Sequence, residues 1–172
     1  MKYCFMMILL FVSISAFSDY DRSDFGRWLD DDNDCQNLRQ EILIEKSLSQ
    51  VTYDETGCKV KSGLWKDDYT GIFYTRSSDV DIDHIVPLKH AFDSGADFWG
   101  KDKMSDFFND PLNLSITRDR VNQSKGSKSI MDWAPEVNKC QYAARWVMVK
   151  VSYDLNFNDD EIMFLRNLTD EC

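Results

Sequence analysis

Two short stretches of this chain alternate strictly between apolar and polar residues. In residues 80–83 and again in residues 112–116, every second side chain is hydrophobic. A period of two is typical of a β-strand that buries one face. The two stretches therefore predict a β-hairpin. Its second strand leads into a predicted helix over residues 118–124, with Thr117 as the N-cap and Gly126 after the last turn.

Around this hairpin the hydrophobic pattern predicts further helices and strands. Apolar residues with helical spacing favour helices over residues 36–47 and 138–153 and a last helix capped by Asn158. The connection between the hairpin strands is long enough for two short helices, 88–94 and 104–108. Short β-prone runs bounded by turn residues predict strands over residues 58–60, 64–65 and 71–75.

The first 18 residues have a different composition from the rest. Lys2 is followed by an apolar run over residues 4–17, and Ala16, Phe17 and Ser18 form a small-residue cleavage site. This pattern predicts a secretory signal peptide over residues 1–18. A membrane anchor is the alternative, but the run falls short of the roughly 20 apolar residues that span a bilayer. The mature chain is expected to be secreted or periplasmic, with no membrane contact.

The remaining chain has the composition of a globular protein, with 43% hydrophobic and 29% charged residues overall. Because it contains no repeat, low-complexity tract or linker, residues 19–172 are expected to form a single α+β domain, with a monomer favoured.

Four cysteines, Cys35, Cys58, Cys140 and Cys172, remain after removal of the signal peptide. An even number in an exported protein indicates two disulfides, and four cysteines allow three pairings. Cys140 opens one predicted helix and Cys172 closes the next, so an antiparallel helix pair would bring them together. We expect Cys35–Cys58 and Cys140–Cys172. Zinc binding is disfavoured because no close Cys-x-x-Cys pair exists.

An acidic cluster lies before the first predicted helix. Four aspartates fall between residues 30 and 34, and Glu41 follows Asp30 by eleven positions. This spacing faintly matches a calcium-binding loop, but Cys35 stands where such a loop has glycine and Leu38 fills a ligand position. The simpler expectation is that the carboxylates cap and favour the N-terminus of the helix.

Three residues near the hairpin suggest hydrolytic chemistry. His84, at the end of the first strand, can accept a proton near neutral pH. Asp83 supplies a carboxylate oxygen and Asn122 an amide oxygen, which suit Mg²⁺ or Mn²⁺ better than a thiolate-binding metal. Such a site could hold one ion against a phosphate while His84 activates water. These residues predict phosphodiester hydrolysis.

Three short motifs in this region resemble the HNH endonucleases of the ββα-metal class. They are Asp81-Ile82-Asp83-His84, Asn109-Asp110-Pro111-Leu112-Asn113 and Arg120-Val121-Asn122. The chain is similar in particular to a secreted branch related to the C-terminal nuclease domain of GmrSD-type restriction enzymes. Asn122 follows Asn113 by nine positions, a spacing common in that family.

The resemblance implies roles for individual residues. His84 would be the general base, and Asp83 and Asn122 the metal ligands. Asn113 would be the second catalytic residue, whose side chain ties the hairpin loop and orients His84. Lys125 would lie near the phosphate. The third motif residue is Asn122 where many family members have histidine. The 29 positions between His84 and Asn113 imply an inserted helical loop.

The charge of the chain is the main objection to a nuclease. The net charge is −10, and a polyanion is repelled by an acidic protein. Residues 118–128, however, carry a local charge of +3. Arg118, Arg120 and Lys125 in this segment are expected to contact substrate phosphate. Arg76 is a further candidate, with a solvated loop cation as the equal alternative.

These observations predict an exported, metal-dependent HNH endonuclease that cleaves DNA, with RNA as a second candidate substrate, and with little sequence preference. The ββα motif over residues 80–128 would be embedded in a disulfide-stapled domain with flanking helices. The alternative is a noncatalytic extracellular binding protein on the same scaffold, in which the oxygen ligands hold a structural cation.

Overall fold

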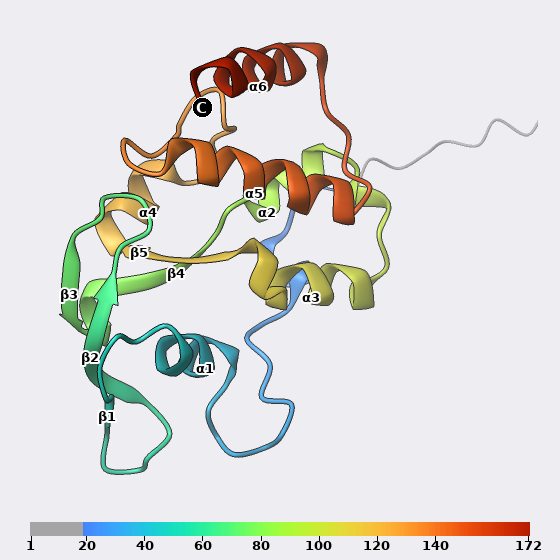
Figure 1. Cartoon of the computed structure of the whole chain (residues 1–172). Helices are drawn as coiled ribbons and strands as arrows, with labels where there is room; N and C mark the ends of the chain where they lie inside the picture. The colour runs from blue at the N-terminus through green and yellow to red at the C-terminus, as the bar shows by residue number, and fades with distance from the viewer. Residues whose placement is uncertain (1–18) are drawn as a thin grey trace, which may run out of the picture.

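A computed structural model of the chain describes residues 19–172 (Figure 1). The predicted signal peptide lies outside the described residues. No helix within residues 19–172 is both long and apolar enough to cross a membrane. The helices and strands run in the order α1 (Leu38–Glu45), β1 (Thr52–Tyr53), β2 (Val60–Lys66), β3 (Phe73–Arg76), β4 (Val80–His84), α2 (Leu88–Asp93), α3 (Lys101–Asn109), β5 (Leu114–Arg118), α4 (Asp119–Lys125), α5 (Lys139–Ser152) and α6 (Asp159–Glu171).

The strands form two small antiparallel sheets. β1, β2 and β3 pair in chain order, and β4 pairs with β5. The predicted hairpin is confirmed, with Ile82 opposite Ile116 and His84 opposite Leu114. Residues 58–60 and 64–65 were predicted as two separate strands. In the structure, residues 60 and 64–65 belong to the single strand β2, and residues 58–59 precede it. No strand was predicted at the position of β1.

The connection between β4 and β5 contains two helices, as the sequence predicted. α2 and α3 correspond to the expected helices 88–94 and 104–108, although α3 begins three residues earlier. Both helices contribute apolar side chains to a larger core, together with α5 and α6. In Figure 1, α5 crosses the middle of the molecule and α6 lies beyond it. The hairpin connection is therefore packed onto the helical layer.

A second, smaller core lies between the two sheets and α1. It is formed by apolar side chains of α1 and β2 and by the hydrophobic face of the β4–β5 hairpin. Trp65 is fully buried here, and its indole N–H donates to the Leu43 carbonyl oxygen at 2.7 Å. The alternation seen in the sequence thus buries one face of the hairpin against α1 and leaves the other face to α4.

The N-terminus of α4 differs from the prediction. Thr117 was expected to cap the helix, but β5 continues to Arg118, which takes the N-cap position without a side-chain hydrogen bond. The Thr117 hydroxyl instead donates to the buried Asp67 carboxylate at 3.0 Å. Asp67 also accepts from the Arg118 backbone N–H, so it holds the end of β5 against the β2–β3 turn.

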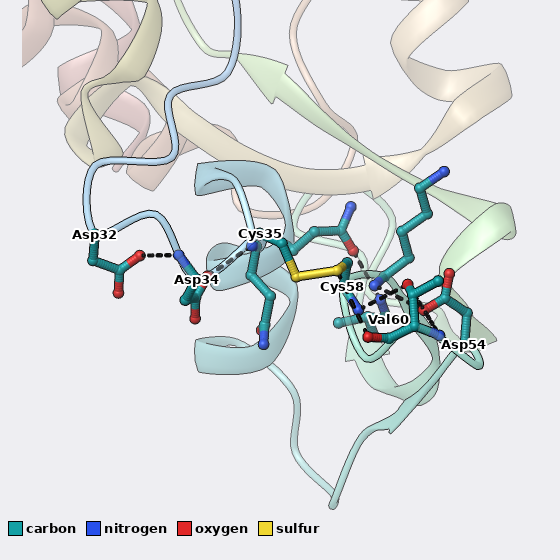
Figure 2. The surroundings of a disulfide bond; sticks show 10 residues. Asp32, Asp34, Cys35, Asp54, Cys58 and Val60 are labelled. Atoms are coloured by element: carbon teal, nitrogen blue, oxygen red, sulfur yellow. Dashed lines mark hydrogen bonds between the residues drawn. A yellow bond between two sulfur atoms is a disulfide. The ribbon is translucent and has the colours of Figure 1, made fainter.

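Both disulfides form between the cysteines that the sequence predicted. Cys35 is bonded to Cys58 and Cys140 to Cys172. The first joins the segment before α1 to the segment before β2 (Figure 2). The second ties the start of α5 to the end of the chain after α6.

Candidate active site

The end of β4 places Asp83 and His84 beside α4. The two residues face Ser115 and Leu114 across the hairpin, and α4 begins directly after β5 and packs against both strands. Two antiparallel strands followed by a helix across them are the ββα unit that the resemblance implied. Asp83 and His84 from β4 and Asn122 from α4 are thereby brought to the same side of the hairpin.

Asp83 is buried and held by two donors. The Tyr69 hydroxyl donates to its Oδ2 at 2.7 Å, and the Lys125 ammonium lies 3.1 Å from Oδ1 and 2.9 Å from Oδ2. Burial raises the pKa of the Asp83 carboxyl, while Lys125 and the Tyr69 hydroxyl act in the opposite direction. The paired ammonium favours the ionised carboxylate, whose orientation is fixed from both sides.

His84 is held as a neutral imidazole with a defined tautomer. Its Nε2 lies 2.8 Å from the Phe108 carbonyl oxygen. Because a carbonyl oxygen only accepts, Nε2 carries the proton and Nδ1 keeps its lone pair. Burial lowers the pKa of His84 from 6.5 to about 3, so the ring is unprotonated at neutral pH. An unprotonated Nδ1 can accept a proton.

Two aromatic rings fix the plane of the His84 imidazole. Trp28 stacks on it with an interplanar angle of 7° and a centroid distance of 5.7 Å. Phe108 packs at 56° with its centroid 4.8 Å away. The imidazole therefore has little rotational freedom, and its hydrogen bond to the α3 end of the inserted loop sets its direction.

Asn113 ties the two ends of the inserted loop together. It is fully buried, and its side-chain oxygen accepts from the Val86 backbone N–H at 2.8 Å. Its amide group donates to the Val86 carbonyl oxygen at 3.2 Å, while its own backbone carbonyl accepts from Ile85. This is the geometry expected for the residue that ties the hairpin loop. The His84 ring, which Asn113 was also expected to orient, is held instead by Phe108 and Trp28.

Asn122 on α4 completes the set of oxygen groups. Its amide nitrogen donates to Asp81 Oδ2 at 2.8 Å, which directs the amide oxygen away from Asp81. Asp81, Asp83, His84 and Asn122 all line one cavity of about 250 Å³. The structure thus brings together three of the four residues that the sequence singled out for catalysis and metal binding, and it adds Asp81. The fourth, Asn113, does not line this cavity.

Comparisons with known proteins agree with this geometry. Residues 30–164 match the family described as "GmrSD restriction endonucleases, C-terminal domain". The chain belongs to this family. It is also 34% identical over 157 residues to an "Uncharacterized secreted protein" of Arthroderma benhamiae, which covers 89% of this chain and 76% of the relative. No solved structure matches the chain.

This GmrSD-family chain is a secreted protein. Its fungal relative is named as secreted, and its two disulfides are of the kind that persist in oxidising extracellular surroundings. The family is one of nuclease domains, so nuclease-type function and a nucleic-acid substrate are the functional statements that the comparison supports.

The donor set of the cavity fits a hard divalent cation. Carboxylate oxygens of Asp81 and Asp83 and the amide oxygen of Asn122 are the ligand types that Mg²⁺ and Mn²⁺ take. Neither sulfur nor a second histidine lines the cavity. Such an ion would share the Asp83 carboxylate with the Lys125 ammonium. Both can bind at once, because each carboxylate oxygen has more than one lone pair.

The predicted phosphate-binding cations lie elsewhere. Lys125 is fully buried and donates to Asp83 and, at 2.7 Å, to the His84 carbonyl oxygen, so its ammonium does not face substrate as we expected. Arg118 and Arg120 line a separate cavity beside Trp133. Arg76 is exposed and forms an ion pair with Asp79 at 2.7 Å.

Other cations lie at the cavity instead. Arg22, in the segment before α1, and Lys89, at the start of α2, both line it. Neither cation was found from the sequence. Trp28 and Tyr69 were also missed, because each lies 14 or more positions from the residue that it contacts, His84 or Asp83, and carries no motif of its own. Asp81 could have been found, because in a strand it shares a face with Asp83.

Proposed function

We propose that the protein is a secreted, metal-dependent endonuclease that hydrolyses phosphodiester bonds of DNA, and of RNA as a second substrate, with little sequence preference. One observation carries the proposal. A neutral imidazole with a free Nδ1 lines the same cavity as two carboxylates and a carboxamide, at the end of a ββα unit. General-base chemistry and cation binding are thereby available within one small space.

In the proposed reaction, His84 Nδ1 takes a proton from the attacking water. The water oxygen forms a bond to phosphorus as the bond to one ester oxygen breaks, and that ester oxygen gains a proton from solvent. The imidazolium then returns its proton to solvent. The Phe108 carbonyl stabilises the charged ring through the Nε2–H, and Trp28 holds the ring in the plane needed for transfer.

Asp83, Asn122 and Asp81 would hold one Mg²⁺ or Mn²⁺. When bound, the ion stabilises negative charge on the phosphoryl group and on the leaving oxygen. The contribution of the protein is to fix these oxygens. Tyr69 and Lys125 hold the Asp83 carboxylate, and Asp81 orients the Asn122 amide.

Arg22 and Lys89 are the proposed phosphate contacts. Both belong to the wall of the cavity, whereas the cations of α4 are buried or point to another surface. An acidic chain still needs local positive charge to approach a polyanion, because phosphate neutralisation supplies most nonspecific affinity. Arg22 would supply that charge at the scissile position. Lys89 would add to it by exchanging its exposed ion pair with Asp93, at 2.6 Å, for the phosphate.

The proposal is tested by incubating supercoiled plasmid with the purified mature protein and a metal series. We expect relaxation and degradation with Mg²⁺ or Mn²⁺ and none with excess chelator. Asn122→Ala should lower cleavage at least tenfold, since it removes an oxygen ligand. The matched control is Gln123→Ala, which changes an exposed neighbour on the same helix and should cleave as the wild type does.

Two outcomes would contradict the proposal. The first is cleavage that persists in excess chelator. The second is a protein whose thermal stability falls on chelation although no metal ion supports any cleavage of DNA or RNA. The second result is the one that a noncatalytic binding protein with a structural cation predicts.

A further inference from the structure

A second cavity lies on the other side of α4 from His84. It has a volume of about 340 Å³, and α4 supplies part of its wall through Arg120, Val121 and Ser124. Asn122 of the same helix lines the cavity around His84. At 3.6 residues per turn, positions 120, 121 and 124 share one side of a helix and position 122 lies on the opposite side. α4 is therefore a ridge between the two cavities.

Tyr69 connects the second cavity to the candidate active site. Its ring lines the second cavity and packs edge to face against Trp133, with the ring centroids 5.2 Å apart. Its hydroxyl donates to the Asp83 carboxylate at 2.7 Å. A single side chain thus separates Trp133 from a proposed metal ligand. A ligand in the second cavity would lie next to the candidate active site.

Two arginines at the second cavity have no acidic partner. Arg118 and Arg120 are exposed, and neither forms an ion pair within residues 19–172. Arg118 lies over the Tyr74 ring, 5.9 Å from its centroid, whereas Arg145 donates to three carbonyl oxygens. Among the described residues that line the cavity, Glu136 is the one carboxylate, so its wall carries a charge of +1. This local charge opposes the net charge of −10 and favours an anionic ligand.

The wall of the second cavity is partly apolar and includes a tryptophan ring. Trp133 is half-buried, and Tyr69 and Tyr142 meet it edge to face, at interplanar angles of 67° and 77°. No ring of the described residues stacks face to face on it. Its indole N–H is open to solvent and has no acceptor within residues 19–172, whereas those of Trp65 and Trp146 are hydrogen-bonded. A nucleobase can stack on such a ring.

A segment of opposite charge also borders the candidate active site. The chain after Trp28, which lines the His84 cavity, continues into the aspartates of residues 30–34. The expectation that these aspartates cap α1 is wrong, because the N-cap is Asn37. Asp32 and Asp34 accept from backbone N–H groups of their own loop instead. A polyanion is repelled by this segment and attracted by the two arginines on the far side of α4.

We propose that the second cavity binds one unpaired nucleotide of the substrate strand. The proposal rests on the nuclease function proposed above and specifies its substrate class, a single strand or a locally opened duplex. The base would stack on Trp133, and Arg118 and Arg120 would bind the neighbouring phosphates. A nucleic acid suits the cavity better than an acidic peptide, because each of its units offers both a planar ring and an anion.

The width of α4 sets the position of this nucleotide. An α-helix with its side chains is about 10 Å across, and a stacked strand rises about 3.4 Å per nucleotide. A strand that crosses α4 from the scissile phosphate would therefore place a base in the second cavity about three nucleotides away. The second cavity would add to affinity for a chain and not to the chemistry at phosphorus.

The test is the binding of a fluorescently labelled single-stranded oligonucleotide to the full mature protein in chelator, measured by anisotropy. Trp133→Ala should weaken binding about fivefold or more, because base stacking is lost, and Trp133→Phe should restore most of the affinity. Arg120→Gln should also weaken binding, and should reduce the slope of log K against log salt by about 0.7, as the loss of one phosphate contact predicts. Phe98→Ala and Arg166→Gln remove an exposed aromatic ring and an exposed cation away from the cavity, and should bind as the wild type does.

Two further measurements separate this site from the active site. Bis(4-nitrophenyl) phosphate is a phosphodiester too short to cross α4, so Arg120→Gln should hydrolyse it at the wild-type rate. With a single-stranded oligonucleotide, the same variant should show a raised KM and an unchanged kcat. The wild type should bind the single strand about fivefold or more tightly than the duplex of the same sequence, because the stacked base must be unpaired.

Unchanged oligonucleotide binding in both Trp133→Ala and Arg120→Gln would overturn the proposal. Equal affinity for single strand and duplex would also overturn it, as would competition by polyglutamate at equal charge, since charge attraction alone would then be sufficient. Binding that depends on Trp133 and Arg120, in a protein that cleaves no nucleic acid, would support this site and contradict the proposed nuclease function. The two failures are thereby distinguishable.

Discussion

The two histidines of this protein lie beside two very similar groups of residues. His84 lies next to the buried Lys125–Asp83 pair, and His90 next to the buried Lys150–Glu161 pair. Both lysines are fully enclosed, and burial lowers the pKa of both histidines. A lysine, a carboxylate and a histidine thus occur together once under the hairpin and once in the helical layer.

The difference between them lies in what each histidine nitrogen contacts. His84 gives its Nε2–H to a carbonyl and keeps a free Nδ1 beside a cavity. His90 Nε2 instead lies 3.3 Å from the Lys150 ammonium, which can only donate. Both Glu161 oxygens accept from Lys150, and one also accepts from Trp146. In the second group the hydrogen-bond partners all come from the protein, so we assign this group to stability and the first group to catalysis.

The largest expected effect is loss of either buried ammonium. Lys125→Met and Lys150→Met each leave an uncompensated buried carboxylate, which costs about 3–5 kcal/mol of unfolding free energy. Denaturant unfolding of both variants measures this. Where enough folded protein remains, Lys150→Met should keep its cleavage rate per folded molecule, while Lys125→Met should lose at least tenfold. Equal activity losses would remove the distinction between the two groups.

Acid should destabilise the protein through both histidines. Their folded pKa values, about 3 for His84 and about 4 for His90, lie below the 6.5 of the unfolded chain. Between these values the unfolded state binds more protons, so stability falls as pH decreases below about 6.5. From pH 7 to pH 5 the loss is on the order of 2 kcal/mol per histidine.

The histidine contribution can be isolated by substitution. In buffer with chelator, His90→Gln should show a shallower dependence of unfolding free energy on pH between 7 and 5 than the wild type. The slope should fall, because one of the two histidines that titrate in this range is removed. A slope equal to that of the wild type would mean that His90 is not held neutral in the folded state.

A smaller effect is expected for the tyrosines that hold carboxylates. Tyr69→Phe removes the hydroxyl bonded to Asp83, and support of this kind is worth about 10–100-fold in activity or metal affinity. Tyr153→Phe removes a comparable bond to Asp110, at 2.9 Å, away from the cavity. Cleavage rates should fall only in Tyr69→Phe. An equal rate loss in both would point to general destabilisation instead.

Local pattern was sufficient to predict much of the fold. The period of two identified β4 and most of β5, and the helix order identified both disulfide pairings. The N-cap of α4 was missed because the Thr117 hydroxyl is hydrogen-bonded to Asp67, which lies 50 positions away in the sequence. Capping preferences are local, and a tertiary hydrogen bond overrode them here.

The candidate site shows the same division. Asp83, His84, Asn113 and Asn122 were chosen as candidates because each lies within a short motif. The cations were misplaced, because the direction of a long side chain such as Lys125 depends on what packs against its helix. Local charge density favoured substrate contact, but the buried Asp83 and the His84 carbonyl provide three closer acceptors.

Single-turnover cleavage of DNA by His84→Ala and His90→Ala, with Mn²⁺ and equal amounts of folded protein, tests the central claim most directly. General-base catalysis is worth about 10²–10⁴-fold, so His84→Ala should lose that much while His90→Ala stays within about threefold of the wild type. A His84→Ala protein that is folded and cleaves at the wild-type rate would contradict the account.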